Sequence, residues 1–334
     1  MEAPVRAMVL AAGGAERLRP LSLKVPKPLM PVGNRPAMEH VLRWLARHGV
    51  REAVVNLYHL RENIKRHFGD GQKFGVSVAY SEEEELLGTA GGVRRASHFF
   101  TETFVVVGGD DLTDIDLRRV VEFHKKSGAL ATIAVTEVQD VSQYGISETD
   151  ESGRIKRYLE KPAPEQTFSH LANTGVYVFE PAIFDFIPDV ERPDFSRHVF
   201  PLLLERGAPF FAVRCQEYWK DIGRPSDLLQ ANADVLTRRC SSEPAGIETV
   251  PGIWIGEACA ADQTAFLEPP VCLGSGATVG QKVRLGPCLA LGNESHASAG
   301  SRLANCVVFD DTIVPRNTML ESALVGPDEV VVRV

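Results

Sequence analysis

A short loop rich in small residues holds the first group of side chains with a recognisable chemistry. An apolar stretch ends at Leu10, small residues follow, and Arg17 and Lys27 come next. The small residues are Ala11, Ala12, Gly13 and Gly14. Backbone N–H groups at such a turn, together with two cations, form a cradle for a polyphosphate. The segment has neither a G-x-G-x-x-G pattern nor a Gly-Lys-Ser/Thr triplet, and its Gly pair alone fits a surface turn equally well.

Two aspartates form the second group. Asp110 follows the β-branched run that ends at Val107, and Asp221 stands two residues after Trp219. Two carboxylates at one polyphosphate repel each other unless a divalent cation lies between them. We therefore expect Asp110 and Asp221 to bind Mg²⁺. The alternative is that Asp110 caps a helix and Asp221 is solvated.

Alternating strands and helices must position these residues. β-branched runs predict strands at 5–11, 53–57, 76–80, 104–107, 131–138 and 176–179, and helical spacing predicts helices at 37–48, 60–67, 91–97 and 117–127. This order indicates an α/β fold, a doubly wound and mainly parallel sheet with right-handed crossovers. Ligands of such sheets bind beyond the carboxyl ends of the strands, so we expect the site in the loops after Ala11 and Val107.

The last ninety residues or so follow a period of six instead. Ten positions spaced by six are all apolar: Ile255, Ala261, Leu267, Leu273, Val279, Leu285, Leu291, Ala297, Leu303 and Phe309. This period predicts a parallel β-helix with one inward apolar residue on each side of a coil. The spacing restarts four residues later at Ile313, Met319, Val325 and Val331, which we interpret as a bulge between coils. Two domains follow, residues 1–240 and 250–334.

Composition narrows the classes of partner. The chain has 36 Lys and Arg against 44 Asp and Glu, a formal charge of −8. This acidic balance argues against nucleic acids and anionic membranes, which clustered basic side chains bind. There is no apolar run of membrane-spanning length and no secretory leader, so we expect a cytoplasmic protein. The cysteines form no C-x-x-C pair, which favours buried thiols over a zinc or redox site.

The loop also resembles the signature of the sugar-1-phosphate nucleotidylyltransferases, G-x-G-T-R-x-x-P-x-T followed by P-K-P. Further segments match the family in order: Glu85 to Gly91, Val107 to Asp110, Tyr144-Gly145, Glu160 to Pro162, Asn173 to Tyr177 and Trp219 to Gly223. The most similar type is the mannose-1-phosphate guanylyltransferases, which carry a C-terminal hexapeptide-repeat, left-handed β-helix. The resemblance implies a nucleotide-diphospho-sugar transferase fold and a reaction of an NTP with a sugar 1-phosphate that gives an NDP-sugar and pyrophosphate.

The resemblance also implies roles for individual residues. The catalytic set is Arg17, Lys27, Asp110, Lys161 and Asp221, of which Asp110 and Asp221 bind Mg²⁺. The nucleotide-binding set is Ala11, Ala12, Gly13, Gly14, Glu82, Glu85, Gly88 and Thr89. The sugar-binding set is Gly145, Glu160, Asn173 and Thr174. In a regular strand the neighbours Glu160 and Lys161 face opposite ways, so only one of them would point into the site.

The base, the sugar and the activity itself leave alternatives open. One carboxylate accepts both adjacent N–H donors of guanine, so Glu82 or Glu85 favours GTP. The resemblance to the mannose-1-phosphate guanylyltransferases also favours GTP and implies mannose 1-phosphate; thymidylyl or uridylyl transfer to glucose 1-phosphate is the alternative. Ala15 and Glu16 replace the usual Gly and Thr of the signature, which admits a catalytically weak, nucleotide-sugar-sensing regulatory subunit. A hexapeptide acyltransferase is a third possibility, with His296 as its only candidate base. We expect a homo-oligomer, with the coil mediating its contacts or holding the catalytic domain in place.

Overall fold

The computed structural model describes residues 5–334, with Glu329 described by its backbone alone. The chain forms two compact units that do not coincide with a single cut in the sequence. The α/β unit contains the residues up to Gly13 together with Val41–Trp219, and the coil unit contains Gly14–His40 together with Lys220–Val334. The phosphate-loop segment, Gly14–His40, thus packs with the C-terminal part of the chain. The functional division into residues 1–240 and 250–334 stays a prediction.

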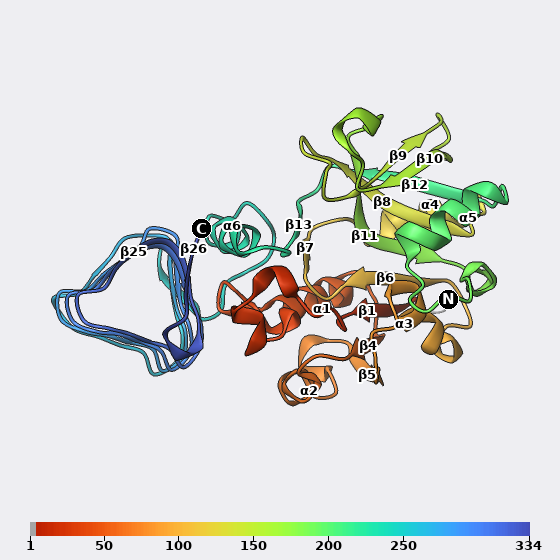
Figure 1. Cartoon of the computed structure of the whole chain (residues 1–334). Coiled ribbons are helices and arrows are strands. Elements are labelled where there is room, and N and C mark those ends of the chain that lie inside the picture. The colour runs from red at the N-terminus through yellow and green to blue at the C-terminus, as the bar shows by residue number, and fades with distance from the viewer. Residues whose placement is uncertain (1–4) are drawn as a thin grey trace. The chain divides into compact units, whose positions relative to one another are not determined.

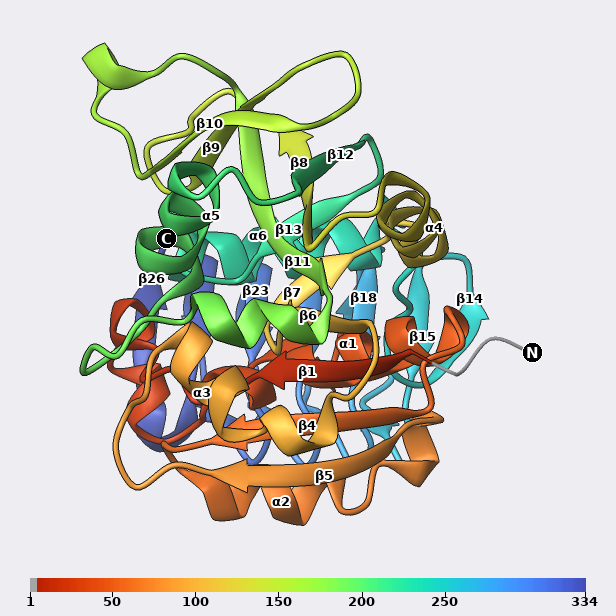
Figure 2. The same ribbon diagram turned by 90° about the vertical axis from the view of Figure 1, so that its right-hand side faces the viewer.

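A single mixed sheet forms the centre of the α/β unit. Its main path runs β10-β9-β11-β6-β1-β4-β5, and β8 joins β11 to β12. The bounds of its strands are β1 Arg6–Leu10, β4 Glu52–Leu57, β5 Ser77–Glu82, β6 Phe104–Gly108, β8 Ala131–Glu137, β9 Gly145–Thr149, β10 Ile155–Glu160, β11 Leu171–Phe179 and β12 Phe210–Cys215. The short strand β7, Asp111–Thr113, lies outside this sheet. The strands predicted from the β-branched runs are present, and Figure 2 shows β1, β4 and β5 side by side.

The two halves of this sheet differ in strand direction. β6, β1, β4 and β5 are parallel neighbours, with Met8 opposite Val54 on one side and Val106 on the other. β11 is antiparallel to β6, β8 and β9, whereas β12 is parallel to β8, so the second half of the sheet is mixed. The β11 register shifts between Asn173 and Tyr177. The strand–helix alternation predicts only the parallel half, because β9, β10 and β11 follow one another without a crossover helix.

The helices and an aromatic core complete the α/β unit. Their bounds are α1 Ala37–Arg47, α2 Arg61–Phe68, α3 Thr89–Arg95, α4 Leu117–Ser127 and α5 Phe200–Glu205; α1 begins in the coil unit and ends in the α/β unit. α1 buries Trp44, whose indole N–H donates to the Ile115 carbonyl at 2.9 Å. Between the sheet and the helices, Phe104, Phe179 and Phe200 are fully buried in one apolar cluster.

Stacked coils form most of the second unit, as Figure 1 shows for β25 and its neighbours. The coil strands are β14 Ile247–Val250, β15 Ile253–Ile255, β16 Ala260–Ala261, β17 Phe266–Leu267, β18 Val271–Leu273, β19 Thr278–Val279, β20 Arg284–Leu285, β21 Leu289–Leu291, β22 His296–Ala297, β23 Arg302–Val308, β24 Ile313–Val314, β25 Met319–Val325 and β26 Val331–Arg333. Parallel pairing joins β15, β18, β21, β23 and β25 in succession. The parallel β-helix is therefore present; its left-handed sense stays a prediction.

The register of the last coil corrects the predicted slip. Leu273 pairs with Leu291, but Leu291 pairs with Val308 and not with Phe309, so the coil shortens by one residue. Val314 consequently takes the inward position and is fully buried, whereas Ile313 is 60% exposed and Met319 is 66% exposed. Val331 lies on β26, which runs antiparallel to β25. Period six fails here because one residue is missing between Leu303 and Val308 and another between Leu320 and Val325. Val325, one of the predicted restart positions, does lie inward and is 3% exposed.

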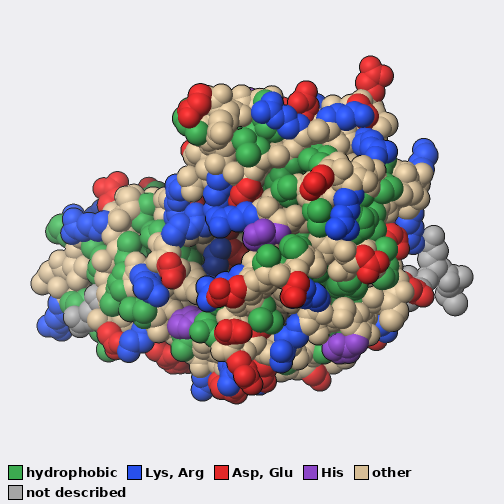
Figure 3. Space-filling model, turned by 45° about the vertical axis from the view of Figure 1, so that its right-hand side comes forward, with side chains coloured by type: hydrophobic (Ala, Val, Ile, Leu, Met, Phe, Trp, Pro, Cys, Tyr) green, Lys and Arg blue, Asp and Glu red, His purple; other side chains and the backbone are tan. Residues whose placement is uncertain are grey.

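The coil unit also contains the segments that surround the predicted phosphate loop. These are β2 Pro31–Val32, β3 Arg35–Pro36 and α6 Pro225–Leu236, while β13 Trp219–Asp221 crosses from one unit into the other. α6 packs along β21, β23 and β25, where Leu236 joins Trp254 and Cys272 in a small apolar cluster. Among residues 5–334 no helix has the length and apolarity needed to cross a membrane. Figure 3 shows acidic and basic side chains intermixed over one face.

Candidate active site

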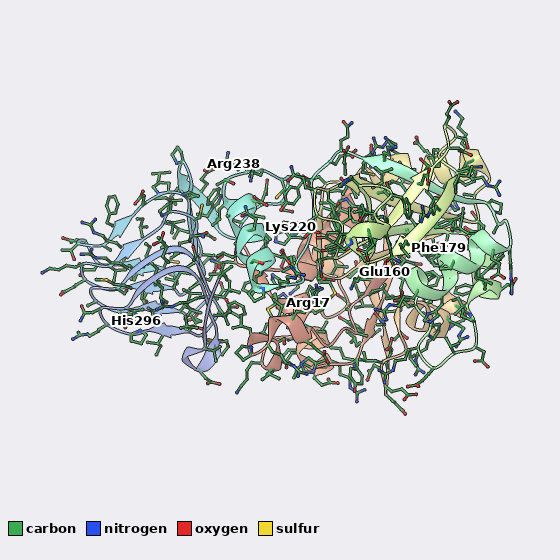
Figure 4. All side chains as sticks on the ribbon, turned by 45° about the horizontal axis from the view of Figure 1, so that its top comes forward. Arg17, Glu160, Phe179, Lys220, Arg238 and His296 are labelled. Atoms are coloured by element: carbon green, nitrogen blue, oxygen red, sulfur yellow. The ribbon has the colours of Figure 1, made fainter. Side chains whose placement is uncertain are left out.

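Three of the predicted catalytic residues meet in the coil unit. Lys27 Nζ lies 3.2 Å from Asp221 Oδ1, and Arg17 Nη2 lies 3.9 Å from Asp221 Oδ2. Arg17 stands in a one-turn 3₁₀ helix, Glu16–Leu18, and Lys27 begins another, Lys27–Leu29. Figure 4 marks Arg17 and, next to Asp221 in sequence, Lys220. Residues almost 200 positions apart in sequence thus form one charged cluster. The sequence motifs named these residues but did not predict which of them are in contact.

Two further residues shape this cluster without having been predicted. A Cβ on Gly223 would lie 2.7 Å from both Arg17 Nη2 and Asp221 Oδ2, so a larger residue here would displace the ends of these two side chains. Asp227, in the first turn of α6, is partly buried, and this burial, reinforced by the charge of Asp221, raises its pKa. Asp227 has no motif of its own, so its place beside Asp221 follows only from the fold of α6.

Ala15 and Glu16 are the two residues that differ from the family signature. Ala15 has φ 49° and ψ 43°, the left-handed region that favours glycine. The glycine that the family usually has at this position would adopt it without strain. Glu16 is exposed. Gly13 and Gly14 have open space where a Cβ would stand, so the absence of side chains leaves this stretch of the loop accessible.

In the α/β unit, a buried polar chain links the loop after β1 to the loop after β5. Ala11 N donates to Asn56 Oδ1 at 2.8 Å, and Asn56 Nδ2 donates to Glu83 Oε1 at 2.7 Å. Leu87 N donates to Glu83 Oε2 at 3.0 Å. Asn56 and Glu83 are 3% and 2% exposed, so their polar atoms are satisfied by one another. Neither residue is predicted from the motifs; an Asn inside the apolar run 53–57 is the sequence signal that points to Asn56.

The other glutamates of this loop have different surroundings. Glu82 pairs with Lys65 and Arg61, and the hydrogen bond from Lys65 holds the pKa of its carboxyl below the usual value. Glu85 is exposed. A pocket of about 490 Å³ lies at the carboxyl ends of β4 and β5. It is lined by Tyr58, Leu60, Arg61, Glu62, Glu83 and Glu84. Neither Glu82 nor Glu85 lines this pocket.

Gly88 and Thr89 stand at the start of α3 and connect it to the segment before α5. Gly88 has φ 76°, and a Cβ there would lie 2.5 Å from the Pro193 carbonyl oxygen. Thr89 Oγ1 donates to Asp194 Oδ2 at 2.8 Å and accepts from Phe195 N at 3.0 Å. Both residues therefore fix the backbone next to the predicted sugar-binding set, in addition to the predicted nucleotide role.

Three of the four predicted sugar-binding residues come together in the α/β unit. Asn173, 8% exposed, donates to the hydroxyls of Tyr158 at 3.1 Å and Tyr177 at 3.0 Å. Tyr158 donates to Glu160 Oε2 at 3.3 Å, and burial raises the pKa of the Glu160 carboxyl. A Cβ on Gly145 would collide with the Tyr158 hydroxyl and lie 2.7 Å from Glu160 Oε2. Glycine is therefore required where β9 approaches this cluster.

The remaining predicted residues of this unit lie apart from the hydroxyl cluster or at its edge. Thr174 Oγ1 donates to the Ala134 carbonyl at 2.9 Å inside the sheet. Lys161 is exposed and has φ 47°, so it lies outside β10 and does not alternate with Glu160 as in a regular strand. Its charge lowers the pKa of Glu160, against the larger effect of burial. Lys161 and Glu160 are thus neighbours that can act on one ligand.

Asp110 lies at the carboxyl end of β6, as the sequence predicts for a metal ligand. It is half-buried in the turn after Gly108, and the next residue, Asp111, is 7% exposed and accepts from Gly108 N at 3.1 Å. The described residues contain no group of three His, Cys, Asp or Glu side chains able to hold a metal ion. Mg²⁺ usually binds one or two carboxylates together with substrate phosphates and water, so a site made of single aspartates fits this ion only when a nucleotide is bound.

Comparisons with known proteins identify the family. Residues 6–238 match the family model described as nucleotidyl transferase. The chain is 39% identical to UTP–glucose-1-phosphate uridylyltransferase of Synechocystis sp., covering 92% of this chain and 83% of that protein. It is 32% identical to mannose-1-phosphate guanylyltransferase of Mycobacterium tuberculosis, covering 95% and 83%.

A solved structure from Bacillus anthracis, named as a glucose-1-phosphate thymidylyltransferase, gives the corresponding fold. It superimposes with a TM-score of 0.62 at 25% identity and covers 69% of this chain and 94% of its own. The expected nucleotide-diphospho-sugar transferase fold is thereby confirmed. Because the family model spans more than half of the chain and the relatives match nearly all of it, the chain belongs to the nucleotidyl transferase family.

Proposed function

We propose that this protein transfers a nucleotidyl group from an NTP to a sugar 1-phosphate, releasing pyrophosphate and forming an NDP-sugar. The observation that carries the proposal is the meeting of Arg17 and Lys27 at Asp221, on a loop whose pattern is the family signature. The names of the relatives from Synechocystis and Mycobacterium tuberculosis support the same reaction class.

The protein would catalyse this reaction by stabilising the charge on the leaving group and by positioning the two substrates. Arg17 and Lys27 neutralise the charge that grows on the departing pyrophosphate, and Asp221 fixes Lys27 before the nucleotide arrives. A bound Mg²⁺, held by Asp110 and Asp221, would neutralise further charge on the triphosphate. No nucleophilic side chain is needed, because the sugar phosphate itself attacks the α-phosphorus and the pyrophosphate leaves.

The sugar is assigned to the cluster around Asn173. Glu160 accepts hydrogen bonds from sugar hydroxyls, Asn173 orients the neighbouring tyrosine hydroxyls, and Gly145 lets the strand approach. Lys161 holds the phosphate of the sugar 1-phosphate. Thr174 is left out of the proposed site, because its hydroxyl is used by the Ala134 carbonyl.

GTP with mannose 1-phosphate is our first expectation for the substrate pair, with Glu85 as the carboxylate that accepts from guanine. UTP with glucose 1-phosphate is the second candidate. Two observations favour it: Glu82 is already paired with Lys65 and Arg61, and the uridylyltransferase from Synechocystis is the more similar of the two relatives described above.

A panel of NTP and sugar 1-phosphate pairs tests the proposal. Release of pyrophosphate is measured by a coupled assay with and without Mg²⁺, and the NDP-sugar is identified by mass. We expect turnover with one pair and dependence on Mg²⁺, which Asp110→Asn abolishes while the circular dichroism spectrum stays unchanged. Tight nucleotide binding without turnover of any pair would show a sensing subunit instead. Transfer from acetyl-CoA would show the acyltransferase.

The wider organisation is part of the proposal. Residues 1–240 form the catalytic domain and residues 250–334 the hexapeptide-repeat domain. The protein assembles as a homo-oligomer in the cytoplasm and has no nucleic-acid partner, in keeping with its formal charge of −8. Sizing chromatography with light scattering measures the assembly.

A further inference from the structure

A turn of the phosphate-loop segment is inserted into the side of the β-helix. Asn34 stands at this turn with φ 59° and is 6% exposed. Its Nδ2 donates to the Leu291 carbonyl at 2.9 Å and to the Cys272 carbonyl at 3.2 Å. Cys272 and Leu291 lie on β18 and β21, which are neighbouring coils. One side chain of the loop segment therefore binds the backbone of two coils.

The residue before it is held on the other side. Gly33 N donates to Asn232 Oδ1 of α6 at 2.8 Å, and Ala245 N donates to the Gly33 carbonyl at 2.7 Å. Asn232 is 1% exposed and donates through Nδ2 to the Pro31 carbonyl at 2.8 Å. Gly33 has φ 56°, and a Cβ there would lie 3.1 Å from Pro244 Cα. The turn thus fits closely between α6 and the coil, with its backbone groups bonded to both.

A short hairpin connects this fixed turn to the turn that carries Lys27. β2 and β3 pair on either side of it, Val32 opposite Arg35, and Ala37 N donates to the Met30 carbonyl at 2.9 Å. Met30 N donates to the Lys27 carbonyl at 3.0 Å. The turn that carries Lys27 therefore ends where the hairpin begins, and it has no longer strand or helix of its own to hold it.

The β-helix also meets this segment near its other end. Leu21 is 1% exposed and lies directly against the position of a Cβ on Gly326, at the turn after β25. Lys24 Nζ lies 2.9 Å from Asp328 Oδ2, but both side chains are largely exposed, so this pair contributes little. Lys27 consequently lies between two places where the segment contacts the coil, at Leu21 and at Asn34.

We propose that Asn34 is a positioning residue for the phosphate site, and that the β-helix, through Asn34, holds Lys27 at Asp221. The coil is then a working part of the nucleotide site and not only a module for assembly. This inference rests on the proposed function for the role of Lys27. The hydrogen bonds that support it are between buried groups, where a lost partner leaves carbonyls unsatisfied.

Asn34→Gly is the decisive variant, because glycine adopts the same left-handed turn and removes only the amide. The matched control is Asn317→Gly, an exposed Asn of the coil with φ 57°. We expect Asn34→Gly to raise KM for the NTP by about 5- to 30-fold, with a smaller fall in kcat. NTP binding measured by calorimetry without sugar phosphate should weaken by the same factor. Asn317→Gly should change neither.

A second readout does not need turnover. Trypsin should cut after Lys24, which is followed by Val25, faster in Asn34→Gly than in the wild type or in Asn317→Gly, because the segment is released from the coil. If no substrate pair turns over in the wild type, the proposed function fails, and the proteolysis result still decides whether Asn34 anchors the segment.

Unchanged KM, NTP affinity and cleavage rate in folded Asn34→Gly would overturn the inference, even if its melting temperature fell. Should that variant not fold, Asn232→Ser takes its place. It removes the bonds to Gly33 N and the Pro31 carbonyl and leaves Asn34 intact. The same direction is expected with a smaller size, and wild-type values for this variant would reject the anchor.

Discussion

The two units hold their candidate functional residues by different means. In the α/β unit, Asp110, Glu83 and Ala11 stand at or just beyond the carboxyl ends of parallel strands, where the ladder register fixes the backbone. In the coil unit, Gly14–His40 contains only two strands of two residues each, and side-chain hydrogen bonds attach it to α6 and to the coils. A segment with so little regular structure depends on residues far away in sequence, so distant changes should affect it most.

The largest effect should come from the charged cluster of the coil unit. Lys27→Ala removes a cation that stabilises the departing pyrophosphate, and kcat/KM should fall by about 10²- to 10³-fold. Lys24→Ala is the matched control, because Lys24 is exposed and pairs only with Asp328 among the ion pairs described. Initial rates of pyrophosphate release measure both. A similar fall in the two variants would contradict a specific role for Lys27.

The next effect tests the α/β unit. Gly145→Ala places a methyl group against the Tyr158 hydroxyl and Glu160, so strands β9 and β10 must shift. We expect a loss of about 1 to 3 kcal/mol in unfolding free energy and a raised KM for the sugar phosphate, with KM for the NTP nearly unchanged. Glu148→Ala, exposed on the same strand, is the control. Urea unfolding and steady-state kinetics provide the readouts, and a change confined to the NTP would reject the assignment of this cluster to the sugar.

Acid should weaken the α/β unit before the coil. His124 is fully buried, and burial lowers its pKa below the usual 6.5. Below pH 6.5 the unfolded chain therefore binds a proton at His124 that the folded chain does not bind. The contribution of neutral His124 to the unfolding free energy is complete above pH 6.5 and is lost as the pH falls towards the folded pKa. The loss is about 1.4 kcal/mol per unit of pKa difference. Unfolding at pH 8 and pH 5.5 measures it, and His124→Gln should flatten the dependence.

In the coil unit the shifted cysteines titrate at the alkaline end. Burial raises the pKa of Cys272 to about 12 and that of Cys306 to about 11. These thiols stay neutral in the folded state near pH 7 and add no acid sensitivity. Hydrogen exchange of each unit at pH 5.5 measures which one unfolds first. If the coil unfolds before the α/β unit, the expected order of acid sensitivity is wrong.

The smallest effect concerns the strained loop residue. Ala15→Gly relieves the left-handed conformation at φ 49° and should raise the unfolding free energy by up to about 1 kcal/mol. Ala258→Gly, at φ 54° and exposed on the coil, should give a similar gain in melting temperature. If Ala15→Gly also changes kcat while Ala258→Gly does not, the left-handed conformation of Ala15 affects the rate of turnover. A fall in stability would show that Ala15 makes contacts that outweigh its strain.

Local patterns in the sequence were sufficient for the elements and for the family. Short β-branched runs and helical spacing predicted six strands and four helices of the α/β unit, but not β9, β10, β12 or α5. Period six predicted the coil, because burial of every inward side chain repeats with the geometry of each element. The signature loop and the later motifs indicated the set of site residues. Arg17, Lys27 and Asp221 do meet, as do Gly145, Glu160 and Asn173.

Only the tertiary structure decided which polar groups satisfy one another. Nothing in the pattern showed that Asn56 and Glu83 join two loops or that Thr174 bonds within the sheet. No sequence motif pointed to Asn34, whose amide bonds to β18 and β21 exist only in the folded chain. A hydrogen bond depends on where two distant segments meet, and that position is set by packing of the whole fold, whereas periodicity is set by each element alone.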